Sequence, residues 1–185
     1  MQDAYWKAFL AEPVTVLGVQ LRPFSLGHSL LLDVYESPFC KGGAVTLTEL
    51  VFAVWICSRK FQDAIDDIHK DQFDKECRRW GRKCRRADFN REMEVFDQYV
   101  SEHSQCPRRW DTPGKKSGGP RVPWQLAMFW NLCRGQIDES LWDLPLGRAI
   151  VYSATRLTSE GDQDFVSDEE WEFISDGKSE DSGEG

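Results

Sequence analysis

The cysteines and histidines in the middle of the chain are the residues whose types could most readily bind a metal. Cys77, Cys84, His103 and Cys106 offer thiolates and an imidazole, the usual ligands of zinc. On a helix, Cys77 and Cys84 are separated by a rise of about 10 Å, whereas both sulfurs of a shared zinc lie about 2.3 Å from the ion. That separation also excludes a disulfide between them. We therefore interpret both cysteines as small apolar residues on a buried helix face, and expect no metal or other cofactor.

A dense basic segment at residues 75–91 is the second candidate for chemistry. Such a surface can contact phosphates, so one alternative is a helical module that binds nucleic acid. The other is a solvated face, or one that meets an acidic surface such as the chain's own C-terminal segment. The basic side chains are Lys75, Arg78, Arg79, Arg82, Lys83, Arg85, Arg86 and Arg91, with Arg78, Arg79, Arg82, Lys83 and Arg86 as the candidate surface.

Catalytic motifs are the third possibility. The chain has no recognisable nucleophile with a neighbouring base, no paired-carboxylate site and no phosphate-binding glycine loop. His28 follows Gly27 on a predicted amphipathic helix, which favours a structural histidine over a general base. His69 and His103 are predicted at helix ends, where an imidazolium meets the negative end of the helix dipole. We predict that the chain is not an enzyme.

The C-terminal segment is strongly acidic. Of the net charge of −8, the residues from Ser159 onward contribute eleven acidic side chains against Lys178 alone, so the preceding residues carry about +2. Acidic residues interleaved with aromatic ones can stay solvated and then fold against a partner. The alternative is a short helix at residues 167–174 that packs back onto the body. The candidate partner-binding residues are Phe165, Val166, Trp171, Phe173 and Ile174.

The compartment is expected to be the cytoplasm. No signal peptide is recognisable in residues 1–11, which favours free thiols for the six cysteines. The longest apolar run, residues 50–57, is much shorter than the roughly 20 residues that span a bilayer. No membrane partner is expected.

Hydrophobic periodicity predicts the elements that position these residues. A strand or short hairpin is expected at residues 14–21, followed by a helix that Ser25 caps and that is closed by Pro38. Thr46 or Thr48 begins the longest predicted helix, whose apolar stripe continues to Ile68. Two further helices are expected at residues 71–84 and 88–103.

The C-terminal half is expected to hold the centre of the core. Residues 104–121 lack periodicity and predict a mobile loop. The helix from Pro123 to Gly135 is apolar on nearly every side, so we expect it to be buried. Asp138 is predicted to cap a short turn, and Asp143 a last helix beginning near Pro145. These patterns predict a mainly α, compact helical domain at residues 1–160, with a minor N-terminal β element, and a disordered acidic tail at 161–185.

Two regions resemble a known family. The segment LRPFSLGHSLLLDVYESPF at residues 21–39, with the apolar helix at 47–58, is similar to the start of tail assembly chaperones of tailed phages and prophages. The runs VPWQLAMFWNLCRG, LWDLPLGRAIVYSATRL and VSDEE resemble the later helices of such proteins. The basic middle, residues 70–120, has no counterpart in them.

The resemblance implies a transient binding role. Members of that family bind the tape-measure protein or tail subunits and keep apolar segments from aggregating during assembly. We therefore expect a non-catalytic assembly chaperone or adaptor whose partner is a protein, with nucleic-acid binding through residues 75–91 as the alternative.

Overall fold

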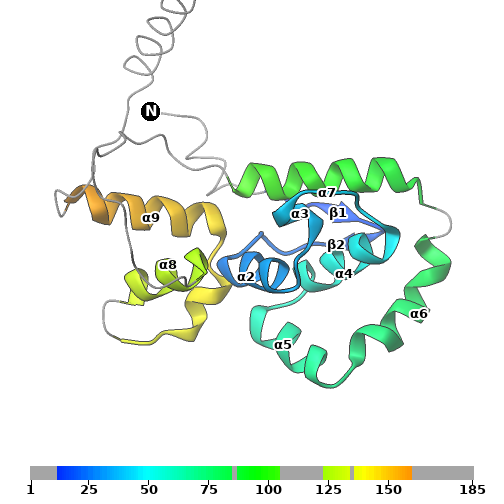
Figure 1. Ribbon diagram of the computed structural model, residues 1–185, viewed down its shortest axis with the longest axis horizontal. Helices are drawn as coiled ribbons and strands as arrows, with labels where there is room; N and C mark the ends of the chain where they lie inside the picture. The colour runs from blue at the N-terminus through cyan, green and yellow to red at the C-terminus, as the bar shows by residue number, and fades with distance from the viewer. Residues whose placement is uncertain (1–11, 85–86, 105–122, 134–135, 160–185) are drawn as a thin grey trace, which may run out of the picture.

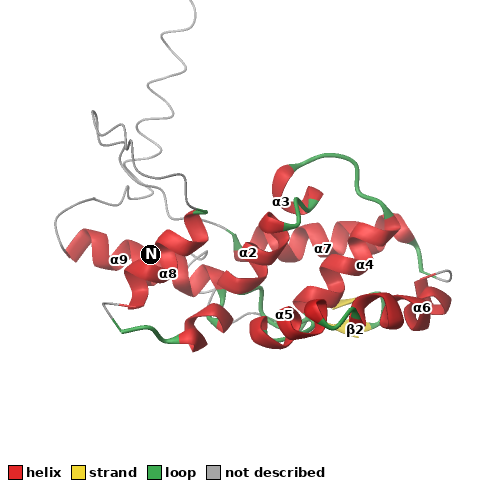
Figure 2. Ribbon diagram, turned by 60° about the horizontal axis from the view of Figure 1, so that its bottom comes forward, coloured by secondary structure: helices red, strands yellow, loops and turns green. Residues whose placement is uncertain are grey.

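The computed structural model describes residues 12–84, 87–104, 123–133 and 136–159, and Figures 1 and 2 show that this part of the chain is mainly helical. The predicted mainly α fold with a minor β element near the N-terminus is confirmed. The elements in chain order are β1 (Thr15–Val16), β2 (Val19–Gln20), α2 (Leu26–Val34), α3 (Pro38–Lys41), α4 (Leu47–Cys57), α5 (Phe61–His69), α6 (Gln72–Cys84), α7 (Phe89–His103), α8 (Trp124–Cys133), η1 (Glu139–Asp143) and α9 (Leu146–Ser159).

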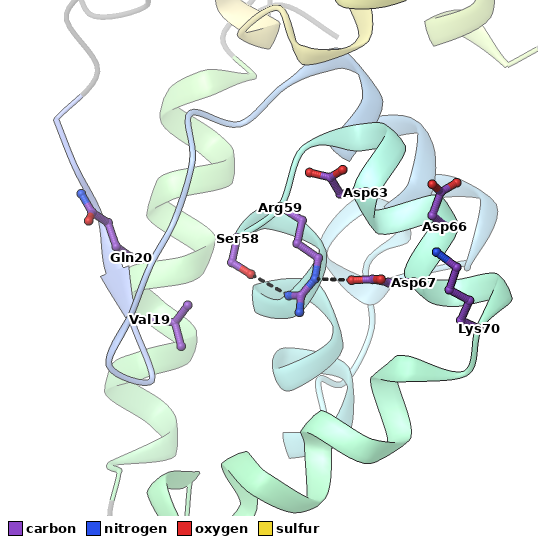
Figure 3. Close-up of a pocket in the computed structure, with 8 residues that line it drawn as sticks. All are labelled: Val19, Gln20, Ser58, Arg59, Asp63, Asp66, Asp67 and Lys70. Atoms are coloured by element: carbon purple, nitrogen blue, oxygen red, sulfur yellow. Dashed lines mark hydrogen bonds and ion pairs between the residues drawn. The ribbon is translucent and has the colours of Figure 1, made fainter.

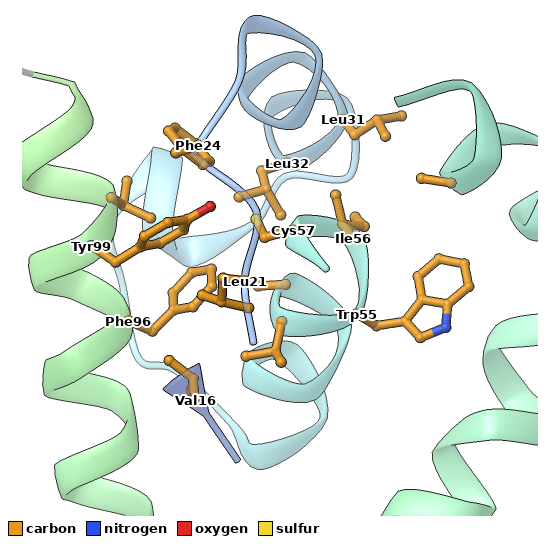
Figure 4. Packing of buried hydrophobic residues seen from close by; sticks show 14 of the residues in the cluster. Val16, Leu21, Phe24, Leu31, Leu32, Trp55, Ile56, Cys57, Phe96 and Tyr99 are labelled. Carbon is orange, nitrogen blue, oxygen red and sulfur yellow. The ribbon is translucent and has the colours of Figure 1, made fainter. Parts of the chain in front are cut away.

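Helix α4 forms the centre of the core. Its sequence, LTELVFAVWIC, is apolar after the first turn, and each residue from Ala53 to Cys57 is fully buried. It packs against α2, α6 and α7. Figure 4 shows Cys57 of α4 on the side of Phe96 and Tyr99 of α7, whereas Trp55 points to the opposite side of the helix, where it packs against Phe73 of α6. The prediction that the helix after Pro123 is the buried centre was therefore wrong.

The two strands form a tight hairpin. Val16 pairs with Val19, so Leu17 and Gly18 are the two turn residues, and both have positive φ angles, 52° and 69°. This conformation is typical of the turns that match the twist of a hairpin. The Leu17 amide donates to Glu92 Oε2 at 2.5 Å, which fastens the turn to α7.

Three predicted helix caps are present, together with one at Asp88 that was not predicted. Ser25 and Thr46 each accept a hydrogen bond from the backbone amide three residues later, and a side chain bonds back to each cap, completing two capping boxes. Asp88 caps α7 and Asp138 caps η1. The local chemistry of Ser25, Thr46 and Asp138 was sufficient to predict where α2, α4 and η1 begin.

The long helix predicted from Thr46 to Ile68 is instead two helices. Helix α4 ends at Cys57 and α5 begins at Phe61. Polar side chains satisfy the backbone groups freed by the break: the Ser58 hydroxyl donates to the Trp55 carbonyl at 2.8 Å, and the Arg59 carbonyl accepts from His28 Nε2 at 2.8 Å. The hydrophobic periodicity continued across the break and concealed it.

A second difference concerns proline and aspartate at helix starts. Pro38 was expected to close a segment, but it is the first residue of the short helix α3, a position that suits its fixed φ angle. Asp143 was expected to cap the last helix. Its carboxylate instead accepts from the Phe61 amide at 2.9 Å and supplies the cap that α5 lacks locally.

Helices α8 and α9 lie side by side at one end of the molecule, next to α2 (Figure 1). The starts of α2 and α9 are joined by an antiparallel bridge between Ser25 and Pro145. The Leu26 amide donates to the Leu144 carbonyl at 3.0 Å, and the Leu146 amide donates to the Phe24 carbonyl at 2.7 Å. These two bonds tie the C-terminal helices to the core. The predicted tail at 161–185 and, apart from Ser104, the predicted loop at 104–121 lie outside the described residues.

Candidate functional site

The outer face of α8 is the most distinctive surface in the described part of the chain. The helix, WQLAMFWNLC, contains no charged residue. Its Trp124 side chain is 48 % exposed, Leu126 is 40 % exposed and Trp130 is 66 % exposed. Large exposed aromatic side chains on an uncharged helix are typical of a surface that binds another protein.

The opposite face of α8 explains why these tryptophans point outward. Gln125, Phe129 and Cys133 are spaced by four residues and are buried. The Gln125 amide nitrogen lies 3.2 Å from the Ser29 hydroxyl of α2. The Phe129 ring stacks on Trp142 with a centroid distance of 4.1 Å and an interplanar angle of 5°. This anchoring fixes the rotation of α8, so Trp124 and Trp130 face away from the core.

Further exposed apolar residues lie near α8 in the sequence. Within the described ranges, eight large apolar side chains are at least 40 % exposed, and five of them fall between Trp124 and Tyr152. Ile137, in the connection to η1, is 73 % exposed. This surface was not predicted from the sequence, because the apolar composition of α8 favours burial of the whole helix. The polar Gln125, followed at steps of four by Phe129 and Cys133, was the signal that could have identified the buried side.

A cleft of about 580 Å³ lies between the hairpin and α5 (Figure 3). Three carboxylates of α5 belong to its wall, with the Arg59 guanidinium beside Asp67 and the hairpin on the other side. The residues that line it are Val19, Gln20, Ser58, Arg59, Asp63, Asp66, Asp67 and Lys70.

Arg59 uses its guanidinium to hold three helices together rather than to face a ligand. It forms ion pairs with Asp67 of α5 at 3.2 Å and with Glu76 of α6 at 2.5 Å. Its guanidinium carbon also lies 4.3 Å from the centroid of the Trp55 ring, a cation–π contact with α4. Glu76 in turn accepts from Trp55 Nε1 at 3.1 Å. We interpret the cleft primarily as part of this structural connection.

His28 is the structural histidine that its position predicted. Its ring is buried, Nδ1 accepts from the Ser25 amide at 3.2 Å, and Nε2 donates to the Arg59 carbonyl at 2.8 Å. Burial, which disfavours the charged ring, lowers the pKa of His28 to about 4, against a smaller opposing effect of the bond to Arg59. The ring is therefore neutral at pH 7 and links α2 to the α4–α5 junction.

The candidate zinc ligands have separate structural surroundings. Cys77 is half-buried and Cys84 is buried, both on α6, and burial raises the pKa of each thiol. His103 is buried at the end of α7, where Nδ1 donates to the Tyr99 carbonyl at 2.7 Å. Cys106 lies outside the described residues. Among the residues that the structure describes, no three or more His, Cys, Asp or Glu side chains are grouped to hold a metal ion.

The remaining candidate residues are only partly located. Arg78, Arg79, Arg82 and Lys83 belong to α6, but the structure describes no side chain at these positions, and Arg86 lies outside the described ranges. Nucleic-acid binding by this segment therefore stays a prediction. The tail residues lie outside the described residues as well: Phe165, Val166, Trp171, Phe173 and Ile174.

Helices that could span a membrane are absent from the described ranges, because none combines the required length with sufficient hydropathy. The chain was also compared with known proteins. No family model matches it, and neither a curated protein nor a solved structure does. The resemblance of residues 21–39, residues 47–58 and the C-terminal runs to phage tail assembly chaperones therefore stays a prediction.

Proposed function

We propose that this chain is a non-catalytic assembly chaperone or adaptor, and that the outer face of α8 binds an apolar segment of a phage tail protein. The exposure of Trp124 and Trp130 on an uncharged helix is the observation that supports the proposal. Exposed tryptophan surface is costly to leave in water, and tryptophan is enriched among the residues that dominate binding energy. The tape-measure protein or a tail subunit is the partner that the resemblance implies.

The face of α8 suits an apolar helical partner in particular. Trp124 and Trp130 are six residues apart, which corresponds to about 9 Å along the helix axis. Leu126 and the exposed Ala127 lie between them in the sequence. A short side chain between bulky ones leaves a depression that can receive an apolar side chain of a partner helix. Because α8 has no charged group, such a partner would desolvate no charge on this helix.

The proposal predicts a tape-measure gene close to the gene of this chain, and co-expression with the product of that gene tests it. The chain should increase the soluble fraction of that protein, and the Trp124→Ser, Trp130→Ser double variant should lose most of this effect. Val34→Ser is the matched control, because Val34 is 60 % exposed on α2 rather than α8. Equal loss in the control, or no effect of the wild-type chain on any tail protein of the cluster, would contradict the proposal.

A further inference from the structure

We infer that, without a partner, the chain's own C-terminal segment at residues 165–174 covers the outer face of α8. Three properties of the chain support this: the point at which it leaves α9, the length of the segment and the charge of the segment. Occupancy of α8 by this segment is independent of any partner. Only its consequence, that a partner must displace the segment, rests on the proposed function.

The chain leaves α9 beside the last turn of α8. The Arg156 guanidinium, in the last turn of α9, donates to the backbone carbonyl of Asn131. Asn131 directly follows Trp130, the most exposed tryptophan of α8. Figure 1 shows the two helices side by side, and they are in contact. Ser159, where α9 ends, is one helical turn beyond Arg156, so the C-terminal segment starts close to the apolar face.

The length of the intervening chain is sufficient. Six residues lead from Ser159 to Phe165, and six extended residues reach at most about 20 Å. Trp124 lies only about 9 Å farther along α8 than Trp130, so both tryptophans are within reach. If the ten residues 165–174 were helical, they would be about 15 Å long, the same length as the ten residues of α8.

The chemistry of the two segments is complementary. The C-terminal segment contains five apolar residues, interleaved with Asp168, Glu169, Glu170 and Glu172. Burial of these apolar side chains against another apolar surface is favourable. Four carboxylates would be repelled by an acidic surface, but α8 has no charged residue. The apolar side chains can therefore lie on the row formed by Trp124, Ala127 and Trp130, which are spaced by three residues and exposed, while the carboxylates remain in water.

A weak contact is enough because the segment is tethered. A short flexible linker gives an effective concentration in the millimolar range, so a contact with a dissociation constant of about 0.1 mM in trans would be about 90 % formed within the chain. A partner would then bind about tenfold more weakly to the full chain than to one whose segment cannot dock. The segment thus shields α8 until a stronger apolar ligand displaces it.

Photo-crosslinking of the full chain tests this inference without a partner present. We would replace Trp130 by p-benzoylphenylalanine, irradiate the protein at low concentration, and map the adducts by mass spectrometry. Adducts within single chains should join position 130 to residues 165–174, at about ten times the yield from the same probe at Val34, because the segment is tethered near α8. The double substitution Trp171→Ser, Ile174→Ser should remove most of the adduct.

Several results would overturn the inference. These are a covalent dimer, adducts mainly with residues 1–11 or 105–122, a yield at position 130 equal to that at position 34, or an adduct that persists in the double variant. The same probe placed at Trp124 is a second, independent position on α8. Its adducts should also map to residues 165–174. Since no partner is added, failure here leaves the proposed function standing, and failure of the co-expression test leaves this inference standing.

Discussion

Acidification should unfold this protein partly through His28. The ring is buried and neutral, with Nδ1 accepting from the Ser25 amide and Nε2 donating to the Arg59 carbonyl. Below pH 6.5 the unfolded chain binds a proton at this histidine, whereas the folded chain does not until about pH 4. A depressed pKa of a base therefore contributes stability above pH 6.5 that is lost as the pH falls to about 4.

The magnitude follows from the difference between the two pKa values. Each unit corresponds to about 1.4 kcal/mol, so a shift from 6.5 to about 4 gives a loss of about 3 kcal/mol from the free energy of unfolding. Protonation would also place an N–H at Nδ1 opposite the N–H of Ser25, so the hydrogen bond between them would be lost. This is the structural reason why the folded protein loses stability when His28 is protonated. For a protein of ordinary stability this is a large fraction of the total.

Urea denaturation of wild type and His28→Gln at pH 7, 6, 5 and 4 measures the effect. Because the carboxylates titrate in both proteins, the difference in unfolding free energy between them isolates the histidine. Wild type should be the more stable at pH 7, and its advantage should shrink by about 3 kcal/mol by pH 4. His69→Gln, at the exposed end of α5, is the control. An advantage of wild type over His28→Gln that is the same at pH 7 and pH 4 would refute the reasoning.

Three further substitutions test the packing around this histidine by urea denaturation. Gly27→Ala should cost about 1–3 kcal/mol, because an added Cβ would lie 2.4 Å from Phe61 Cδ2; a cost that does not fall when Phe61 is also replaced by Ala would argue against the clash. Asp143→Ala should cost about 1 kcal/mol by removing the cap of α5, and an unchanged midpoint would count against that role. Glu76→Ala should cost about 1–3 kcal/mol, because it leaves Nε1 of the buried Trp55 without its acceptor; an equal effect of the exposed Glu94→Ala would contradict it.

The beginnings of α2 and α4 could be predicted because they depend on local chemistry. Ser25 and Thr46 satisfy amides only three residues away, so their role is visible in the sequence. The cap of α5 could not be predicted in this way. Asp143 is 82 residues from Phe61 in the chain, and only the tertiary fold brings them together.

The burial of α8 was predicted wrongly, and this prediction concealed the candidate binding surface. Its composition is apolar on almost every side, which by itself favours burial at the centre of a core. Helix α4 is more apolar still and occupies that place, which leaves α8 to pack through one face. The stacking of Phe129 on Trp142 and the bond from Gln125 to Ser29 decide which face. These contacts span distant parts of the chain, so the exposed tryptophans emerged only from the structure.

The affinity of the purified chain for an apolar segment of a tape-measure protein, the proposed partner, tests the central claim most directly. Titration calorimetry would compare wild type, Trp130→Ala and Val34→Ala, the last two removing exposed apolar side chains from different helices. If the face of α8 is the binding surface, Trp130→Ala should weaken binding by about 30-fold, as expected for a dominant interface residue. Val34→Ala should leave the affinity unchanged. Binding that is equally strong in all three proteins would contradict the claim.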